Sequence, residues 1–121
     1  MPALDRLTTP LIALAGLLGA AGVGLAAAAA HLGGALIGPA STMCLAHAPA
    51  ILALLALSPR LRTATPAAIA LGIGTLLFSG DLVFKQFVGA SLFPMAAPAG
   101  GILMIVGWLV AASGALLPKR T

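Results

Sequence analysis

Residues 65–89 read TPAAIALGIGTLLFSGDLVFKQFVG, and the run from 67 to 88 contains only two charged side chains. About 20 predominantly apolar residues are enough for an α-helix to cross the ~30 Å hydrocarbon core of a bilayer. The Thr-Pro pair at 65–66 is typical of a helix start, and Gly89 is typical of a helix end. This stretch therefore predicts a transmembrane helix over about residues 67–88.

The overall composition excludes an ordinary soluble domain. Of the 121 residues, 61% are hydrophobic and 7% are charged, and the mean hydropathy is +1.18. A soluble domain carries about a quarter of its residues as charged side chains. The formal charge of +4 comes without a basic run, so it favours anionic lipid headgroups over nucleic acid as a partner. A single cysteine excludes an internal disulfide.

Three further apolar windows predict a bundle of four transmembrane helices. The first opens at a Thr-Pro pair, with Pro10 as its first helical residue, and stops at the glycine pair 33–34. No window alternates polar and apolar residues as a membrane β-barrel requires. We expect an all-α integral membrane four-helix bundle, formed by residues 1–121 as one domain. The three added spans cover about residues 11–31, 40–57 and 98–117.

The basic residues predict the orientation of the bundle. With four spans, five of the six Lys and Arg residues fall on one face of the membrane, and the connections 32–39 and 89–97 carry none. The positive-inside rule makes that face cytoplasmic, with both termini inside, and the expected location is the bacterial inner membrane. We expect anionic lipid headgroups to contact Arg6, Arg60, Arg62, Lys119 and Arg120.

Small residues recur every four positions in two of the expected spans. They are Gly16, Ala20 and Gly24 in the first span, and Gly107, Ala111 and Ala115 in the fourth. Small residues at this spacing let helix backbones approach closely, and van der Waals contact is a principal attraction between helices in lipid. Two interpretations are open: packing within the bundle, or association of the chain with itself.

Several motifs of this chain resemble those of a known protein family. They are HAPAILALLAL at 47–57, FSG at 78–80, PAGG at 98–101 and GW at 107–108, together with His31 in AAHLGG. In this combination and order they resemble the family called domain of unknown function 423. Many relatives have Ser after FSG, where this chain has Asp81. The resemblance implies a small four-span inner-membrane protein and no established activity.

Asp81 and Lys85 stand four residues apart in an otherwise apolar span. A carboxylate at mid-span costs about 2.5–3.5 kcal/mol on insertion scales, so it needs a partner. Lys85 lies one helical turn further on, which predicts an ion pair. Because a lysine can extend to the membrane surface, Lys85→Ala should then be more damaging than Asp81→Ala. His47 is expected near the same membrane depth, and His31 at the outer end of the first span, in a shallower position.

These residues allow a structural and a functional interpretation. In the first, the Asp81–Lys85 pair and a hydrogen bond from His47 to Asp81 hold the helices together. In the second, the side chains form a protonatable cluster within the membrane. Its members are His31, His47, Asp81 and Lys85. Cys44 and His47 are also three residues apart on one helix face, and with His31 and Asp81 they would make four donors for zinc or copper. A single CxxH is weak evidence, and we predict no cofactor.

Motifs for catalysis are mostly missing. Asp5 is the only acid besides Asp81, so a mechanism with paired carboxylates has no second member in the bundle. Ser79 and Asp81 point about 200° apart on one helix, so no Ser–His–Asp set is expected. We expect no enzyme but an accessory or scaffold subunit that acts by helix association, as a homo-oligomer or in a larger complex. The alternative is an oligomeric conduit for protons, ions or small solutes.

Overall fold

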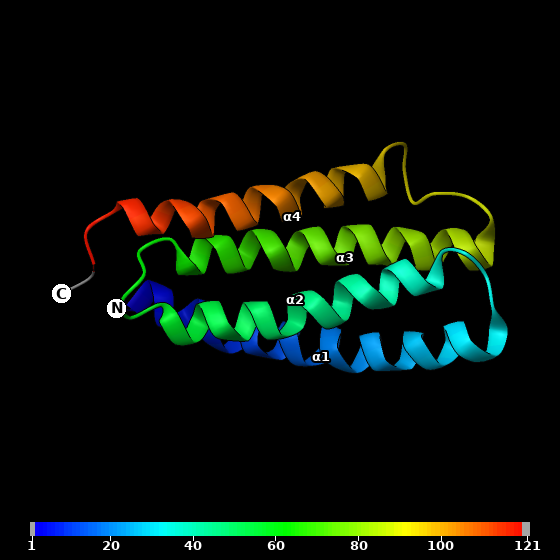
Figure 1. The fold of residues 1–121 in the computed structure, drawn as a ribbon, viewed down its shortest axis with the longest axis horizontal. Helices are drawn as coiled ribbons and strands as arrows, with labels where there is room; N and C mark the ends of the chain where they lie inside the picture. Colours follow the sequence, from blue (N-terminus) through cyan, green and yellow to red (C-terminus); the bar gives the residue numbers. More distant parts are fainter. Residues whose placement is uncertain (1, 120–121) are drawn as a thin grey trace.

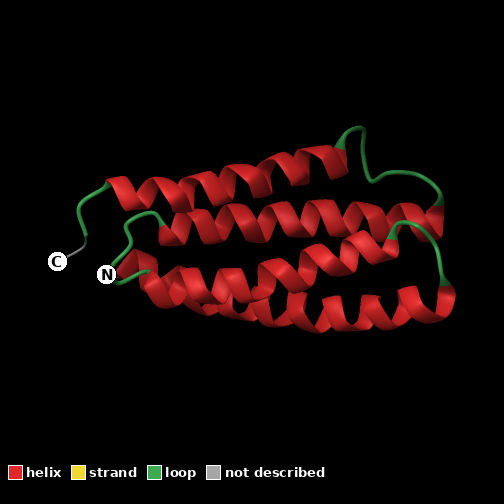
Figure 2. Ribbon diagram, in the orientation of Figure 1, coloured by secondary structure: helices red, strands yellow, loops and turns green. Residues whose placement is uncertain are grey.

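The computed structural model describes residues 2–119, with side chains from Arg6 onward, and these residues form four long α-helices (Figures 1 and 2). Within the described residues there is no strand, which confirms the all-α four-helix prediction. The helices are α1 (Pro2–Leu32), α2 (Ile37–Leu57), α3 (Ala64–Val88) and α4 (Ala96–Ser113), and a short 3-10 helix, η1 (Gly114–Leu116), follows α4.

Successive helices run antiparallel, so the bundle has two distinct ends (Figure 1). The two chain termini and the α2–α3 connection lie at one end, here called the terminal end. The α1–α2 and α3–α4 connections lie at the other, the distal end. The main helix contacts are α1 with α2, α2 with α3, and α3 with α4, whereas α1 touches α3 only slightly. The two central helices are therefore α2 and α3.

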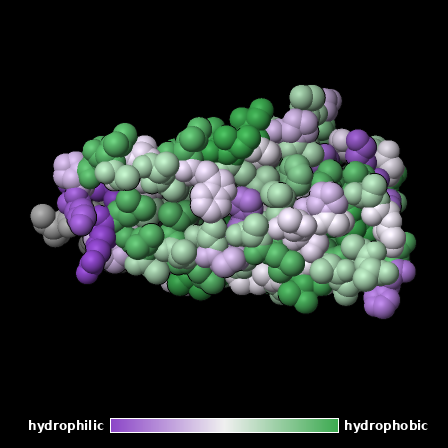
Figure 3. Space-filling view, viewed as in Figure 1, coloured by the Kyte–Doolittle hydropathy of each residue, from purple (hydrophilic) through white to green (hydrophobic). Residues whose placement is uncertain are grey.

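All four helices are long and apolar enough to cross a membrane, so the chain is a multi-pass membrane protein. In α2 and α3, 44% of the spanning window is buried inside the bundle, against 22% in α1 and α4. Figure 3 shows apolar side chains over much of the flank and hydrophilic ones mainly at the two ends of the bundle. The outer helices α1 and α4 thus present most of the surface that lipid or another helix can cover.

The helix starts differ from the predicted ones because of where proline sits. In α2, α3 and α4 the proline is the third helical residue: Pro39, Pro66 and Pro98. The first four N–H groups of a helix have no partner within it, so proline loses no hydrogen bond there. The predicted start of the first span was wrong, since α1 begins at Pro2 and Pro10 lies inside it. The Arg6 carbonyl that Pro10 cannot bond lies near the terminal end, where water can replace the lost donor.

Two predicted helix ends are confirmed. α1 ends at Leu32, and Gly33 and Gly34 follow with φ of +73° and +95°. α3 ends before Gly89, which has φ +88° and donates its N–H to the Lys85 carbonyl. These backbone conformations suit glycine because it has no Cβ to clash.

Glycine lets α3 and α4 touch backbone to backbone. A Cβ added at Gly100 would lie 2.5 Å from the Phe78 nitrogen, and one added at Gly74 would lie 2.9 Å from the Gly100 oxygen. About two turns further along α4, a Cβ at Gly107 would meet Leu71 at 2.8 Å. Gly107 therefore packs within the bundle, with Ala111 half-buried one turn beyond it.

The small residues of α1, in contrast, face away from the other helices of the bundle. Gly16, Ala20 and Gly24 are all exposed, and a Cβ added at either glycine would find nothing within 4 Å. α1 contacts the rest of the bundle instead through Ala15 and Leu18, which are buried. The row Gly16, Ala20 and Gly24 is thus not covered by any other helix of this chain.

Candidate functional site

The polar side chains inside the bundle begin with Asp81, which is 2% exposed. Its Oδ1 accepts a hydrogen bond from the Leu92 N–H at 2.7 Å, and its Oδ2 accepts one from the Ala97 N–H at 3.2 Å. Leu92 belongs to the α3–α4 connection, and Ala97 is the second residue of α4. The N-terminus of a helix carries a partial positive charge that favours a carboxylate. Asp81 therefore ties the connection and the start of α4 to α3.

Lys85 does not pair with Asp81 in the described part of the chain, so the predicted ion pair was wrong. The Lys85 side chain is exposed, whereas both Asp81 oxygens are bonded by backbone amides. The physical reason is position: Lys85 lies in the last turn of α3, at the distal end, where its long side chain can leave the bundle. Removal of Asp81, and not of Lys85, should then be the more damaging change.

His47, on α2, is 5% exposed and has a partner at each ring nitrogen. Nδ1 lies 2.8 Å from the Met43 carbonyl oxygen, and Nε2 accepts a hydrogen bond from Trp108 Nε1 on α4 at 3.1 Å. The two rings meet edge to face, with centroids 5.8 Å apart. A carbonyl only accepts and an indole N–H only donates, so these partners select the neutral Nδ1–H tautomer. His47 therefore joins α2 to α4 and has no nitrogen free.

Buried hydroxyl groups form further links between helices. Ser41 on α2 donates to the Gly22 carbonyl of α1 at 2.7 Å. Ser79 on α3 donates to the Ala40 carbonyl of α2 at 3.0 Å. Among the described side chains, only the Thr65 hydroxyl is buried without a hydrogen-bond partner. The polar atoms of the interior thus act as cross-links, which is how hydroxyl groups commonly serve in membrane bundles.

The end of α3 also holds the α1–α2 connection. Gln86 Oε1 accepts a hydrogen bond from the Leu36 N–H at 3.4 Å. The Gln86 side chain packs against Gly34, where an added Cβ would lie 2.7 Å from its Nε2. Together with Asp81, Gln86 makes α3 the helix to which both distal connections are attached.

The four residues of the predicted polar cluster are not joined to one another by hydrogen bonds. His31 is exposed in the last turn of α1, and His47 and Asp81 have the separate partners described above. Cys44 is buried in the core. Within the described residues, no group of three or more His, Cys, Asp or Glu side chains is placed to hold a metal ion. The Nε2 that a metal would need on His47 is occupied by the Trp108 N–H.

Two partners of the buried polar residues were missed from the sequence. The first is Trp108, which is half-exposed and bonded to His47. A signal was present, because the motifs at 47–57 and 107–108 both belong to the pattern that carries the family resemblance. The second is the pair of backbone amides at Leu92 and Ala97, for which the sequence contains no comparable signal.

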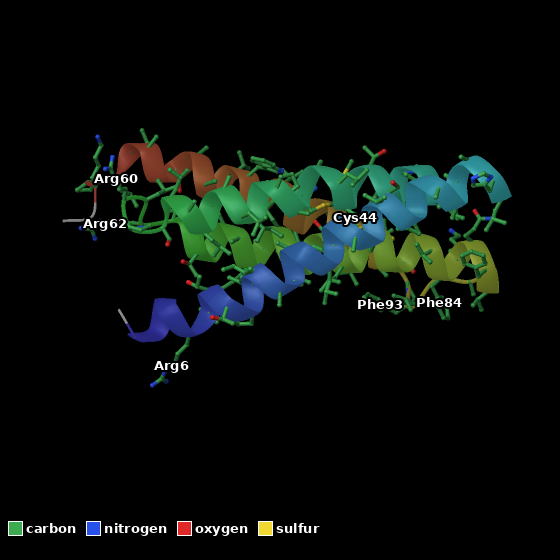
Figure 4. The ribbon with its side chains drawn as sticks, turned by 90° about the horizontal axis from the view of Figure 1, so that it is seen from below. Arg6, Cys44, Arg60, Arg62, Phe84 and Phe93 are labelled. Atoms are coloured by element: carbon green, nitrogen blue, oxygen red, sulfur yellow. The ribbon has the colours of Figure 1, made fainter. Side chains whose placement is uncertain are left out.

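Most of the basic residues expected to contact lipid headgroups lie at the terminal end. Figure 4 shows Arg6, Arg60 and Arg62 at that end of the bundle, and Lys119 is exposed close to the C-terminus. Arg62 Nε donates to the Pro118 carbonyl at 2.9 Å, which joins the α2–α3 connection to the segment after η1. The remaining predicted residue, Arg120, lies outside the described residues.

These features define a class: a small multi-pass membrane protein built as a four-helix bundle with internal polar cross-links. The family model described as "Protein of unknown function (DUF423)" matches residues 18–101, and the chain belongs to this family. The resemblance noted from the sequence is thereby confirmed. The match ends in α4 before Trp108, and it includes both His47 and Asp81. Searches of curated proteins and of solved structures found no match.

Proposed function

We propose that this protein is a non-enzymatic accessory or scaffold subunit of the bacterial inner membrane that acts by helix association. The observation that carries the proposal is the exposed row Gly16, Ala20 and Gly24 on α1, which no other helix of the chain covers. Such a row lets a second helix approach closely, and close approach increases van der Waals contact, a principal attraction in lipid. The partner is a second copy of the chain or another membrane protein.

The state of the interior polar groups supports a role without catalysis. Acid–base chemistry needs a group that is free to give or take a proton at a reacting atom. Both nitrogens of His47 and both oxygens of Asp81 already have hydrogen-bond partners. The same observation counts against a conduit, because a conduit needs polar groups that face a water-filled path.

The distribution of charge supports the orientation. Arg6, Arg60 and Arg62 lie at the terminal end, as the positive-inside rule expects for a cytoplasmic face (Figure 4). Both termini would then be cytoplasmic. Anionic headgroups would contact these side chains from the same leaflet.

Gentle extraction from native membranes followed by native mass measurement tests the proposal. We expect assemblies heavier than one chain, and we expect Gly16→Leu to weaken them at least about tenfold, or by about 1.4 kcal/mol. Ala112→Leu, at an exposed position of α4, is the control and should leave them intact. A lone chain in every preparation would contradict the proposal.

A flux assay separates association from conduction. Vesicles that contain the protein should pass protons and monovalent ions no faster than empty vesicles. Flux above that level, lost in Asp81→Asn, would instead establish the conduit.

A further inference from the structure

The α3–α4 connection, residues 89–95, turns back along α3 before α4 begins (Figure 1). Asp81 fixes how far it returns, because the Leu92 N–H donates to its Oδ1 at 2.7 Å. Asp81 precedes Val88, the last residue of α3, by seven residues, which is roughly 10 Å along the helix. Its side chain also tilts towards the start of α3, as every helical Cα–Cβ bond does, and so away from the distal end. Leu92 therefore lies about 10 Å back from the distal end of α3.

Two exposed cations indicate where α3 meets the two membrane surfaces. Arg62 lies just before α3 at the terminal end, and Lys85 lies in its last turn at the distal end. The helical rise from Ala64 to Lys85 is roughly 32 Å. This length matches the ~30 Å hydrocarbon core of a bilayer. Asp81 is one turn, or about 6 Å, closer to the membrane centre than Lys85. At Leu92 the connection thus returns to the outer edge of the hydrocarbon core.

The outward side chains of the connection are apolar. Leu92, Phe93 and Met95 are between 48% and 68% exposed, and the connection contains no charged residue. Phe84 of α3 is also exposed, and Figure 4 shows it on the same side of the bundle as Phe93. Consecutive exposed apolar residues are unfavourable in a loop that faces water. They suit the boundary between acyl chains and headgroups, where aromatic side chains are enriched in membrane proteins.

The backbone at the start of α4 is bonded as an environment poor in water requires. The first N–H groups of a helix have no partner within it. In α4, the Ala96 N–H donates to the Phe93 carbonyl at 3.2 Å, and the Ala97 N–H donates to Asp81 Oδ2 at 3.2 Å. The third residue, Pro98, has no N–H. Non-helical backbone is tolerated at membrane depth where protein groups satisfy it in this way.

The arrangement of charge around the connection favours phospholipid as the molecule that covers it. Lys85 is exposed next to Phe84, on the side of the apolar cluster that faces the distal surface. A phospholipid leaflet has the same order, with anionic phosphates outside and acyl chains inside. A lysine at a helix end extends towards those phosphates while its stem stays in the apolar layer.

We propose that the connection 89–95 is an interfacial anchor, which inserts Leu92, Phe93 and Met95 among the phospholipids of the distal leaflet at the boundary between acyl chains and headgroups. Asp81 holds the connection at this depth through its two hydrogen bonds. The gain comes from keeping three large apolar side chains out of water. The anchor does not depend on the proposed association through α1, since it belongs to another part of the surface.

Spin labels measure the depth of the connection. One label at a time is attached to Phe93→Cys, Arg60→Cys or Ile105→Cys in the whole protein, which carries Cys44→Ala and is reconstituted into dioleoylphosphatidylcholine vesicles. Oxygen concentrates in hydrocarbon, whereas a polar nickel complex stays in water. The ratio of oxygen to nickel collision rates should be at least about tenfold higher at Phe93 than at Arg60, because the apolar layer excludes the polar complex. Ile105, exposed on α4, gives the value for the membrane interior.

Ala90→Cys is the matched control within the same connection. Ala90 follows Gly89 at the end of α3 and is exposed. Its label should meet the nickel complex nearly as often as the label at Arg60, although Phe93 is only three residues further along. Equal ratios at Ala90 and Phe93 would place the whole connection in water and overturn the proposal.

Asp81→Ala tests how the anchor is held. It should lower the ratio at Phe93 towards that at Ala90 and leave the ratio at Ile105 unchanged, which also shows that the bundle remains inserted. An unchanged ratio at Phe93 would overturn the role of Asp81. If this variant does not fold, the labels in the chain with Asp81 intact still decide the depth. Low collision rates with both reagents at Phe93 would show that a second protein chain, and not lipid, covers the connection.

Discussion

At the scale of single residues, Asp81 and His47 show how the bundle accommodates polar groups at membrane depth. Asp81 is bonded by two backbone amides, and His47 is placed between a carbonyl and an indole N–H. An unpaired polar group in this setting would cost several kcal/mol. Both side chains have therefore been joined to partners from another part of the chain, and this gives both residues a structural role.

We predict that Asp81→Ala destabilises the protein by about 3 kcal/mol or more, because two hydrogen bonds to a charged group are lost and two amides lose their acceptor. Lys85→Ala, at an exposed position, should change stability by less than about 0.5 kcal/mol. Asp81→Asn keeps one acceptor oxygen and should fall between them. Reversible unfolding in mixed detergent micelles measures all three. Equal losses in the two alanine variants would show that Lys85 supports the carboxylate after all.

Trp108→Phe keeps an aromatic ring but removes the indole N–H that, among the described residues, donates to His47 Nε2. We expect a loss of about 1–3 kcal/mol, because a buried acceptor is left without a partner. In the wild-type protein, the ¹⁵N chemical shifts of the His47 ring should report a neutral ring that is protonated at Nδ1. The neighbouring change Leu109→Ala, at an exposed position, serves as the control for stability. A ring protonated at Nε2 would disprove the described hydrogen bond.

At the scale of helices, α3 organises the bundle. It packs directly against α2 and α4, its glycines allow backbone contact with α4, and its distal half holds both distal connections. Gly74 and Gly100 mark the closest approach of α3 to α4. Small residues at a helix interface in lipid commonly play this part.

Adjacent glycines in α4 provide a matched test of that approach. Gly100→Ala should destabilise the bundle by about 1–3 kcal/mol, because the new methyl group would meet the backbone of α3. Gly101→Ala should be neutral or stabilising by up to about 1 kcal/mol, since its Cβ would lie 3.8 Å from the Phe78 ring and alanine favours the helix. Thermal melting of the two variants in detergent measures this difference in stability. Similar melting of the two variants would mean that α3 and α4 are further apart.

The positions of the helices could be predicted from the sequence far more accurately than the contacts between different parts of the chain. Apolar runs of sufficient length identified all four helices, and Gly33 and Gly89 marked two of their ends. Helix starts were placed too late, since proline is compatible with the first turn as well as with its first residue. The partner of Asp81 was missed because a helical spacing of four suggests Lys85, whereas the amides of Leu92 and Ala97 become partners only after the chain has folded back. Long-range backbone contacts of that kind leave no local pattern.

At the scale of the whole molecule, the outer helices carry most of the surface that no other helix of the chain covers. α1 exposes the row Gly16, Ala20 and Gly24, which no other helix of the chain covers. The interior, by contrast, has nearly all its polar atoms bonded within the described residues. The proposed function therefore depends on the surface of α1 and not on the interior.

Site-specific photo-crosslinking along α1 in native membranes tests this claim most directly. A benzophenone side chain introduced at Leu17 or Val23 would flank the small-residue row at exposed positions, and Ile105 or Leu109 on α4 would serve as controls. We expect crosslinked protein at Leu17 and Val23, its loss in a Gly16→Leu background, and none at the α4 positions. Products that are absent from α1, or that form equally from α4, would contradict the account.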